Sequence, residues 1–334
     1  MKATSTPLTA NDPSDGCLRA PPLLAVVIPC FNEEAALPAT LVELLARLDE
    51  MIAGGLIQAG SFLYLVDDGS RDASWALIAA AHAGNPRIRG LRLTRNFGHQ
   101  NALLAGLLKV REHCDASISI DADLQQDSRV MAEFVAAWRR GAEVVLGVRH
   151  NRNSDGWFKR SSAQLFYQLM NAMGVRVVAH HADYRLLGRR AMAALSEYGE
   201  SNLFLRYICS QLGFRSEIIP FHVQPRRQGQ SKYNLGRMLQ LAMHGIAPSS
   251  VVPLRLVALT GLCVFLLSTV MAGYVLYQTL VVGSTVPGWA STTLPIYFIG
   301  GVQILCLGVI GEYVGQTLIE VKHRPRYHGD DELF

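Results

Sequence analysis

The stretch SISIDADLQQD, residues Ser117–Asp127, starts as a short apolar strand and ends in two aspartates one residue apart. Alternate residues of an extended chain point to the same side, so Asp121 and Asp123 face one way and Ala122 faces the other. Two carboxylates at this distance repel each other unless a positive charge lies between them. Hard oxygen ligands favour Mg²⁺ or Mn²⁺ over zinc, and Gln125 could supply a third oxygen. Taken in isolation, so short a pattern also fits a solvated turn.

The first half of the chain repeats this arrangement of an apolar run followed by polar residues. Further runs lie at residues 23–34 (LLAVVIPCFNEE), 62–72 (FLYLVDDGSRD), 88–100 (IRGLRLTRNFGHQ) and 142–152 (AEVVLGVRHNR), with helical patterns between them. Strands that alternate with helices predict an α/β fold, a Rossmann-like layer with a mostly parallel sheet. In such sheets ligands bind beyond the carboxyl ends of the strands, where all five polar clusters fall. The clusters together predict one site at one edge of the sheet.

Three common kinds of site are excluded because their motifs are absent. No G-x-G-x-x-G follows the first strand, and neither G-x-x-x-x-G-K-[ST] nor G-x-S-x-G occurs in the chain. What remains is acidic at the strand ends and basic downstream, where arginines crowd between Arg139 and Arg237. This combination suits a divalent cation that bridges carboxylates to a diphosphate, with arginines covering the remaining phosphate charge. The net charge of +4 is modest, and no nucleic-acid partner is expected.

The C-terminal third has the composition of a membrane hairpin. No Asp, Glu, Lys or Arg occurs between Arg255 and Glu312, which leaves room for two spans of about 20 residues each. We predict the spans at Leu256–Val282 and Thr293–Gly311. Basic residues flank both spans and none lies in the loop between them, which places both ends of the hairpin in the cytoplasm. A buried helical hairpin in a soluble core is the alternative.

These patterns divide the chain into five segments. We expect a flexible lead-in at 1–22 with no signal peptide, a catalytic domain at 23–232, amphipathic juxtamembrane helices at 233–255, the two spans within 256–311, and a cytoplasmic tail at 312–334. The six cysteines show no metal-site spacing, and we interpret most of them as small buried residues in a reducing compartment.

Seven motifs occur in one order along the chain: VVIPCFNEE, LVDDGSRD, TRNFGHQNALLAGL, DADLQ, VRHNRNSDGWFKR, DYRLLGRR and QGQSKY. In this order they resemble the family 2 glycosyltransferases of GT-A fold. More closely, they resemble the polyprenyl-phosphate glycosyltransferases, which include dolichyl-phosphate mannose synthase, the bacterial undecaprenyl-phosphate glucosyltransferases and undecaprenyl-phosphate 4-deoxy-4-formamido-L-arabinose transferase. The resemblance extends from Pro22 to Tyr327 and includes the segment after the last span.

The resemblance implies a role for each matching residue. Pro29, Phe31 and Glu33 would hold the nucleotide base and ribose, and Val66 and Asp68 would contact the same moiety. Asp121, Ala122, Asp123 and Gln125 would line the diphosphate and the metal, which would be Mg²⁺ or Mn²⁺. Arg149 would approach the donor phosphates, and Arg226 and Lys232 would lie on a loop that closes over the nucleotide.

The chain also departs from the family pattern. Gln126, Asp127 and Ser128 stand where many relatives continue with D-P-P, so the next helix could start differently. Phe31 replaces the usual Tyr, which keeps the stacking surface but loses a hydroxyl. Ala182 replaces a Gly before Asp183, which puts the local backbone in doubt.

The implied reaction is an inverting transfer of one sugar from a nucleotide-sugar, expected to be a UDP-sugar, to undecaprenyl phosphate. A phosphate monoester is already an oxyanion at neutral pH, so no catalytic base is required. Asp183 is therefore either a base or a group that orients Arg185, and Arg185 is the candidate for binding the acceptor phosphate. We interpret His99 and His222 as structural loop residues.

The same resemblance implies a multi-pass protein of the bacterial cytoplasmic membrane, with a cytoplasmic catalytic domain and a homotetramer as one assembly. Which sugar is transferred stays open. Two alternatives also remain. The first is a processive polysaccharide synthase of the same fold, although no Q-x-x-R-W motif occurs in the chain. The second is a membrane-anchored scaffold that has lost activity.

Overall fold

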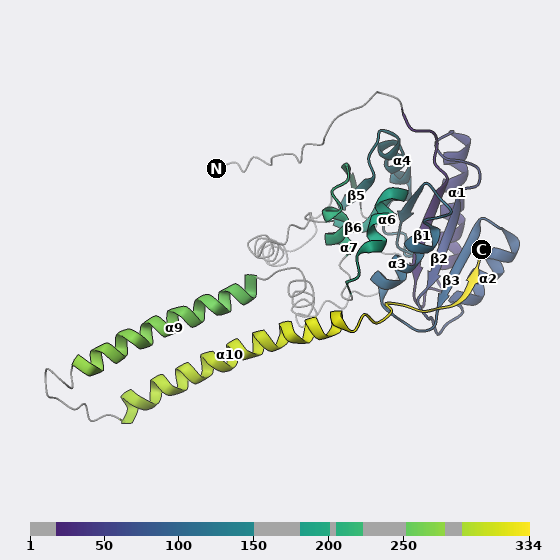
Figure 1. Ribbon diagram of the computed structural model, residues 1–334. Coiled ribbons are helices and arrows are strands. Elements are labelled where there is room, and N and C mark those ends of the chain that lie inside the picture. Colours follow the sequence, from purple (N-terminus) through teal and green to yellow (C-terminus); the bar gives the residue numbers. More distant parts are fainter. Residues whose placement is uncertain (1–17, 150–180, 201–204, 223–251, 278–288) are drawn as a thin grey trace. The chain divides into compact units, whose positions relative to one another are not determined.

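A computed structural model of the protein describes residues 18–149, 181–200, 205–222, 252–277 and 289–334 (Figure 1). The chain divides into two compact units. The first unit combines Met1–Ser162, Val177–Ser231 and Pro325–Phe334. The second unit combines Ala163–Arg176 and Lys232–Arg324. Each unit is described by itself.

The first unit is built on one eight-stranded sheet. In sheet order its strands are β7 (Ser216–Phe221), β5 (Val144–Arg149), β6 (His181–Gly188), β4 (Ala116–Ser119), β1 (Leu24–Cys30), β2 (Phe62–Asp67), β3 (Ile88–Leu93) and β8 (Gly329–Leu333). The pairs β4–β1, β1–β2, β2–β3 and β7–β5 are parallel, whereas β5–β6, β6–β4 and β3–β8 are antiparallel. The predicted α/β fold with a mostly parallel sheet is confirmed.

Helices cover both faces of this sheet. The helices are α1 (Leu37–Ala53), α2 (Ser74–Gly84), α3 (His99–Val110), α4 (Met131–Arg139), α6 (Arg189–Glu197) and α7 (Leu205–Gln211), and a short 3₁₀ turn, η1 (Ser128–Val130), precedes α4. Side chains of α1, α2 and α4 belong to one buried apolar cluster, and those of α3, α6 and α7 belong to another. All seven residues of β1 are buried because both faces of this central strand are covered.

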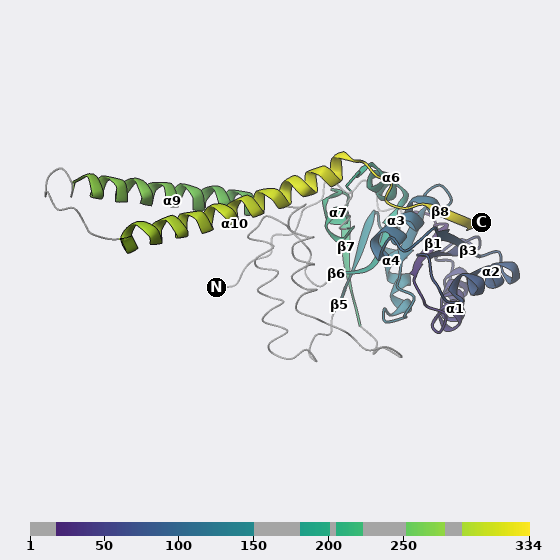
Figure 2. The same cartoon turned by 90° about the horizontal axis from the view of Figure 1, so that it is seen from below.

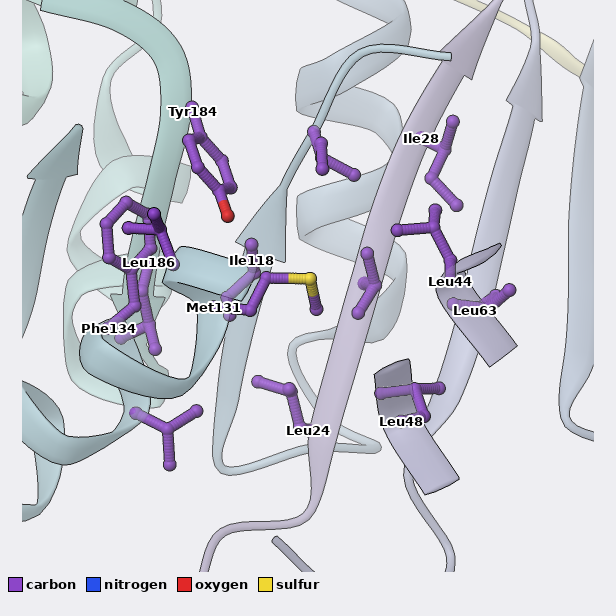
Figure 3. Close-up of a cluster of buried hydrophobic side chains, with 14 of the residues drawn as sticks. Leu24, Ile28, Leu44, Leu48, Leu63, Ile118, Met131, Phe134, Tyr184 and Leu186 are labelled. Carbon is purple, nitrogen blue, oxygen red and sulfur yellow. The ribbon is translucent and has the colours of Figure 1, made fainter. Parts of the chain in front are cut away.

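The alternation of β1 shows how the two clusters are separated. Leu24, Val26 and Ile28 belong to the cluster under α1 and α4, whereas Ala25 and Val27 belong to the cluster under α3. This follows from the two-residue period of a strand, which sends successive side chains to opposite faces. Figure 3 shows the first cluster, in which Leu44 and Leu48 of α1 and Met131 and Phe134 of α4 lie over the strands.

One strand runs opposite to both of its neighbours. β6 lies between β4 and β5 and is antiparallel to both, with Ser119 of β4 opposite Arg185 of β6. Because β6 runs in reverse, its first residues lie at the edge where β4 ends. Asp183 is thereby placed beside the carboxyl ends of the parallel strands.

Residues 325–334 return to the sheet and form its last strand. β8 pairs with β3, and the backbone N–H of Thr94 donates to the carbonyl of His328 at 3.0 Å. Glu332 accepts a hydrogen bond from the hydroxyl of Tyr64 at 2.9 Å and forms an ion pair with Lys109 at 2.6 Å. This strand therefore covers the otherwise open edge of β3.

The second unit is a helical hairpin. Its described helices are α9 (Val252–Tyr277) and α10 (Trp289–Val321), which lie side by side in both views (Figures 1 and 2). In the part of the chain that the structure describes, one segment, Phe298–Val321, is long and apolar enough to cross a membrane. The predicted span Thr293–Gly311 lies within α10, which continues to Val321, and residues 278–282 of the other predicted span lie outside the described residues.

Candidate active site at the carboxyl edge of the sheet

A cavity of about 440 Å³ opens at the carboxyl edge of the parallel strands. It is lined by Pro29, Cys30, Phe31, Glu33, Asp68, Asn96, Gly98, His99, Ala102, Asp121, Ala122 and Asp123. These residues lie at or just beyond the carboxyl ends of β1, β2, β3 and β4, which are neighbours in the sheet, and at the start of α3. Four of the five predicted polar clusters therefore contribute to this cavity, and residues 150–152 of the fifth lie outside the described residues.

Reciprocal hydrogen bonds join the loop after β1 to the loop after β2. The backbone N–H of Asn32 donates to the hydroxyl of Ser70 at 2.9 Å, and the side-chain oxygen of Asn32 accepts from the N–H of Arg71 at 2.9 Å. Glu34 and Asp72 repeat the pattern: Glu34 accepts from the N–H of Ala73, and Asp72 accepts from the N–H of Glu34. The two loops are thus fixed to each other on the β1 and β2 side of the cavity.

Asp68, which follows β2, holds the loop that follows β3. Its two carboxylate oxygens accept the backbone N–H groups of Phe97 at 2.7 Å and Gly98 at 2.9 Å. Gly69 lies so close to this loop that an added Cβ would be 2.4 Å from the carbonyl carbon of Arg95. Burial raises the pKa of Asp68, while these two N–H groups act in the opposite direction.

Gln126 holds the first aspartate of the DAD motif. Its Nε2 donates to Oδ2 of Asp121 at 2.6 Å, and its Oε1 accepts from the backbone N–H of Asp121 at 2.8 Å. Leu124 adopts a left-handed conformation (φ 52°), which turns the chain sharply between the aspartates and Gln126. Burial raises the pKa of Asp121, and the carboxylates of Asp183 and Asp123 add to the rise, although His99 opposes it.

A second polar network adjoins Asp121 through His99. The Nε2 atom of His99 lies 3.6 Å from Oδ1 of Asp121 and 3.7 Å from Oδ2 of Asp183. Asp183 in turn forms ion pairs with Arg185 and with Arg206, the latter at 2.8 Å. Burial alone would raise the pKa of Asp183, but the two arginines outweigh it and hold the pKa well below its usual range. Asp183 is therefore ionised throughout the physiological range.

A family model described as "Glycosyl transferase family 2" matches residues 25–195, which is more than half of the chain. The chain belongs to glycosyltransferase family 2. The predicted family is confirmed, and the protein is a glycosyltransferase with a GT-A fold. A second model, described as "GtrB C-terminal hairpin", matches residues 252–317, which include α9 and most of α10.

Three similar proteins extend this family assignment over nearly the whole chain. YkoT of Bacillus subtilis, described as a glycosyltransferase, is 44% identical over 94% of this chain and 93% of its own length. The glycosyltransferase sll0501 of Synechocystis is 35% identical over 91% of this chain and 93% of its own length. The bactoprenol glucosyl transferase of Shigella phage SfV is 35% identical over 91% of this chain and 97% of its own length.

Seven of the fourteen residues predicted for the family 2 site line the cavity. The predicted residues that line it are Pro29, Phe31, Glu33, Asp68, Asp121, Ala122 and Asp123. Val66 lies in β2 and is completely buried in the cluster under α3. Arg149 is exposed at the end of β5 and is near enough to lower the pKa of Asp121. Arg226 and Lys232 lie outside the described residues.

The predicted partners Asp183 and Arg185 do lie together, but the guanidinium is not at the surface. The side chain of Arg185 is completely buried, and its Nη1 donates to the sulfur of Cys209 at 3.3 Å. A phosphate could therefore reach Arg185 only if the residues around it moved. The proposed binding of the acceptor phosphate by Arg185 stays a prediction.

The sequence interpretation missed three residues of this site. Gln126 was regarded only as a departure from D-P-P, although it holds Asp121 directly. Gln100, whose Nε2 donates to Asp183 at 3.3 Å, belongs to the polar cluster at residues 88–100 but was given no role, and Arg206 was not named. The place of Gln100 in that cluster was an available signal, whereas nothing in the sequence around Arg206 marked it.

Proposed function

We propose that the protein transfers a single sugar from a nucleotide-sugar to the phosphate of a polyprenyl phosphate, with inversion at the anomeric carbon. The observation that carries the proposal is that Asp121 and Asp123 line one cavity with Glu33 and Asp68 at the end of the parallel sheet. The bactoprenol glucosyl transferase among its relatives supports a polyprenyl acceptor. We propose a UDP-sugar as the donor and undecaprenyl phosphate as the acceptor.

The donor side of the cavity is assigned to the loops after β1 and β2. Phe31 is 42% exposed and offers a ring on which a base can stack. Glu33 lines the same wall, with its backbone N–H fixed by the hydroxyl of Ser74 at 2.9 Å. We assign the base and ribose of the nucleotide to this wall, and the diphosphate to the end of β4.

The residues at the end of β4 suit a divalent cation. Among the described residues no three His, Cys, Asp or Glu side chains form a complete metal site. Mg²⁺, however, is usually held by one or two carboxylates together with substrate phosphates and water, which fits Asp121 and Asp123. The raised pKa of Asp121 reflects burial and an excess of negative charge at the acidic cluster, as expected of a cation site.

When bound, Mg²⁺ or Mn²⁺ would neutralise charge on the departing nucleoside diphosphate. The chain itself supplies Arg149 for the same diphosphate, and we assign Arg226 and Lys232 to it as well. Gln126 keeps Asp121 aimed at the cavity. We assign Gln125, two residues after Asp123, as a third oxygen ligand.

No residue is needed to deprotonate the acceptor. The second pKa of a phosphate monoester is about 6, so the attacking oxygen is already anionic at neutral pH. Asp183, whose pKa is depressed by Arg185 and Arg206, would be a weak base in any case. We therefore assign Asp183 the role of orienting arginine side chains.

We place the protein in the bacterial cytoplasmic membrane, with α9 and α10 as two spans and the first unit in the cytoplasm. The apolar segment Phe298–Val321 and the match to a C-terminal hairpin family support this location. Large apolar side chains of both helices are exposed, including Leu262 and Val270 of α9 and Ile304 and Leu307 of α10, as expected of surfaces that face lipid. A homotetramer is the assembly that we propose.

The test is to incubate the purified full-length protein in detergent with undecaprenyl phosphate and a panel of labelled UDP-sugars. We expect one UDP-sugar to give a lipid carrying one sugar, with loss of the product in excess chelator and recovery with Mg²⁺ or Mn²⁺. Asp123→Asn should abolish transfer while the variant still fractionates with membranes. A ladder of longer products would indicate a processive synthase, and wild-type protein inactive with every donor would indicate a scaffold.

A further inference from the structure

Two arginines meet on one buried carboxylate beside the cavity. Arg206 of α7 donates from Nε to Oδ1 of Asp183 at 3.3 Å and from Nη2 to Oδ2 at 2.8 Å. Arg185 of β6 donates to the same Oδ1 atom. Since two guanidinium charges face one carboxylate charge, Asp183 and its two arginines form a group that carries net positive charge.

The two arginines differ in how far they reach the surface. The side chain of Arg185 is 0% exposed, whereas that of Arg206 is 37% exposed. A buried guanidinium needs a counter-ion because the loss of its hydration costs several kcal/mol, and Asp183 meets this need for Arg185. Arg206 is bound by the same carboxylate, yet more than a third of its side chain is exposed.

This group lies next to the acidic end of the cavity. His99 lines the cavity, and its Nε2 atom lies between Asp121 at 3.6 Å and Asp183 at 3.7 Å. Arg206 and His99 therefore both lie within 4 Å of the same oxygen of Asp183. His99 thus contacts both groups, the carboxylates that suit a cation and the net positive group that suits an anion.

We propose that Arg206, aligned by Asp183, binds the phosphate monoester of the acceptor. The inference rests on the function proposed above and assigns to Arg206 the contact predicted for Arg185. A phosphate dianion approaching Asp121 and Asp123 is repelled by them, so it requires a cation of its own close to the cavity. The planar guanidinium binds phosphate through two parallel hydrogen bonds, and Asp183 holds Arg206 in a fixed orientation for that purpose. Arg206 is then a binding residue and Asp183 a positioning residue.

The experiment compares Arg206→Gln and Arg206→Lys with wild type, using the full-length protein in detergent with undecaprenyl phosphate and the active UDP-sugar. Arg140→Gln is the matched control, because Arg140 also donates to both oxygens of one carboxylate, that of Glu217, at 2.9 and 3.1 Å and is 48% exposed. For each protein the KM for the lipid, the KM for the UDP-sugar, the affinity for UDP and the midpoint of thermal unfolding are measured.

We expect Arg206→Gln to raise the KM for undecaprenyl phosphate by about ten-fold or more, because a charge-assisted phosphate contact is lost. The KM for the UDP-sugar and the affinity for UDP should stay within about two-fold of wild type, because the substitution removes no contact with the donor. Arg206→Lys should lie between wild type and Arg206→Gln because it keeps the charge but loses the planar fork. Arg140→Gln should behave as wild type.

The inference is overturned if the KM for the lipid is unchanged in Arg206→Gln, or if the KM values for lipid and donor rise together. Should Arg206→Gln fail to fold, Arg206→Lys decides: an unchanged KM for the lipid contradicts the inference, and a selective rise supports it. If wild type transfers sugar to undecaprenyl phosphate and both variants match it, only this inference fails. If wild type transfers nothing to that lipid, the proposed function fails and the inference fails with it.

Discussion

Gln126 is bound to Asp121 through both ends of its amide, with Nε2 donating to the carboxylate at 2.6 Å and Oε1 accepting from the backbone N–H at 2.8 Å. The amide is almost completely buried, so its orientation is fixed by these two bonds. Residues that orient metal ligands in this way commonly change metal affinity or activity by about 10–100-fold when they are removed. Gln126 therefore gives a direct test of the acidic end of the cavity.

We predict that Gln126→Ala lowers turnover about 10–100-fold at fixed Mg²⁺ and raises the Mg²⁺ concentration that gives half-maximal activity. The measurement is the activity of the full-length protein over a range of Mg²⁺ concentrations. Gln58→Ala is the matched comparison, because it removes an exposed glutamine whose Nε2 donates to the carbonyl of Pro21 and not to Asp121. An equal loss of activity in Gln58→Ala and in Gln126→Ala would contradict this prediction.

Asp68→Asn should loosen the loop that carries Phe97 and Gly98. The amide of Asn has one acceptor oxygen, so one of the two backbone N–H groups would face an NH₂ group, at a cost of about 1–3 kcal/mol in unfolding free energy. The affinity for UDP should fall as well, because Asp68 and Gly98 both line the cavity. Thermal unfolding and calorimetric titration with UDP measure the two effects.

Asp49→Asn provides the control for that experiment. Asp49 forms an ion pair with Arg87 at 2.7 Å, but its side chain is 60% exposed. Exposed pairs contribute about 0–1 kcal/mol, so this variant should remain close to wild type in stability and in UDP affinity. Equal losses of stability and UDP affinity in the two variants would show that the hydrogen bonds of Asp68 contribute no more than an exposed ion pair.

Two glycines with similar backbone angles allow conformational strain to be separated from steric overlap. Gly69 (φ 66°) and Gly55 (φ 63°) are both left-handed, but an added Cβ at Gly69 meets the backbone of Arg95 at 2.4 Å, whereas at Gly55 nothing lies within 4 Å. Gly55→Ala should cost about 1–2 kcal/mol of unfolding free energy from strain alone. Gly69→Ala should cost about 1–3 kcal/mol more, because the loop must move away. Chemical denaturation of both variants measures the difference, and equal values would refute the close approach.

Glu332 makes the attachment of β8 dependent on pH. Burial acts to raise the pKa of Glu332, but the hydrogen bonds from Lys109 and Tyr64 outweigh it, so the pKa is lowered in the folded state. A lowered carboxyl pKa stabilises the fold above the unfolded-state pKa of about 4.3, and this contribution is lost as the pH falls through the folded-state value. Glu332→Gln should therefore be less stable than wild type by about 1 kcal/mol at pH 7, and the difference should shrink at pH 3.

The measurement is the unfolding midpoint of each protein at pH 7 and at pH 3. Glu112→Gln is a suitable control, since Glu112 pairs with its neighbour Arg111 at 3.0 Å with 72% of its side chain exposed. This control should differ little from wild type at either pH. A deficit of Glu332→Gln that is the same at both pH values would rule out the ionic contribution.

The central part of the fold could be predicted because its signals are local. β1, β2, β3 and β4 are short apolar runs between helical patterns, and a parallel sheet follows from that alternation. β6 was not predicted as a strand, because DYRLLGRR was noted only as a motif, and its direction is set by pairing with β4 and β5. β8, with the sequence GDDEL, has no apolar pattern and forms a strand only because the edge of β3 offers it hydrogen bonds.

The same distinction explains the site. Asp68, Asp121 and Asp123 come just after predicted strands. Because ligands bind beyond the carboxyl ends of parallel strands, their position in the sequence was enough to predict that they share one site. Arg206 joins Asp183 across 23 residues of sequence and from a different element, which no spacing pattern reveals. The burial of Arg185 also depends on the packing of Cys209 and the surrounding helices, which only the folded chain establishes.

The position of β8 in the chain has a consequence for biosynthesis. During translation this strand is made after α9 and α10, so the first unit waits for its final strand until the whole hairpin has been synthesised. Until then β3 presents an unpaired backbone edge, to which a second nascent chain could add. A chain truncated within the hairpin would thus lack β8 and leave this edge of the sheet open.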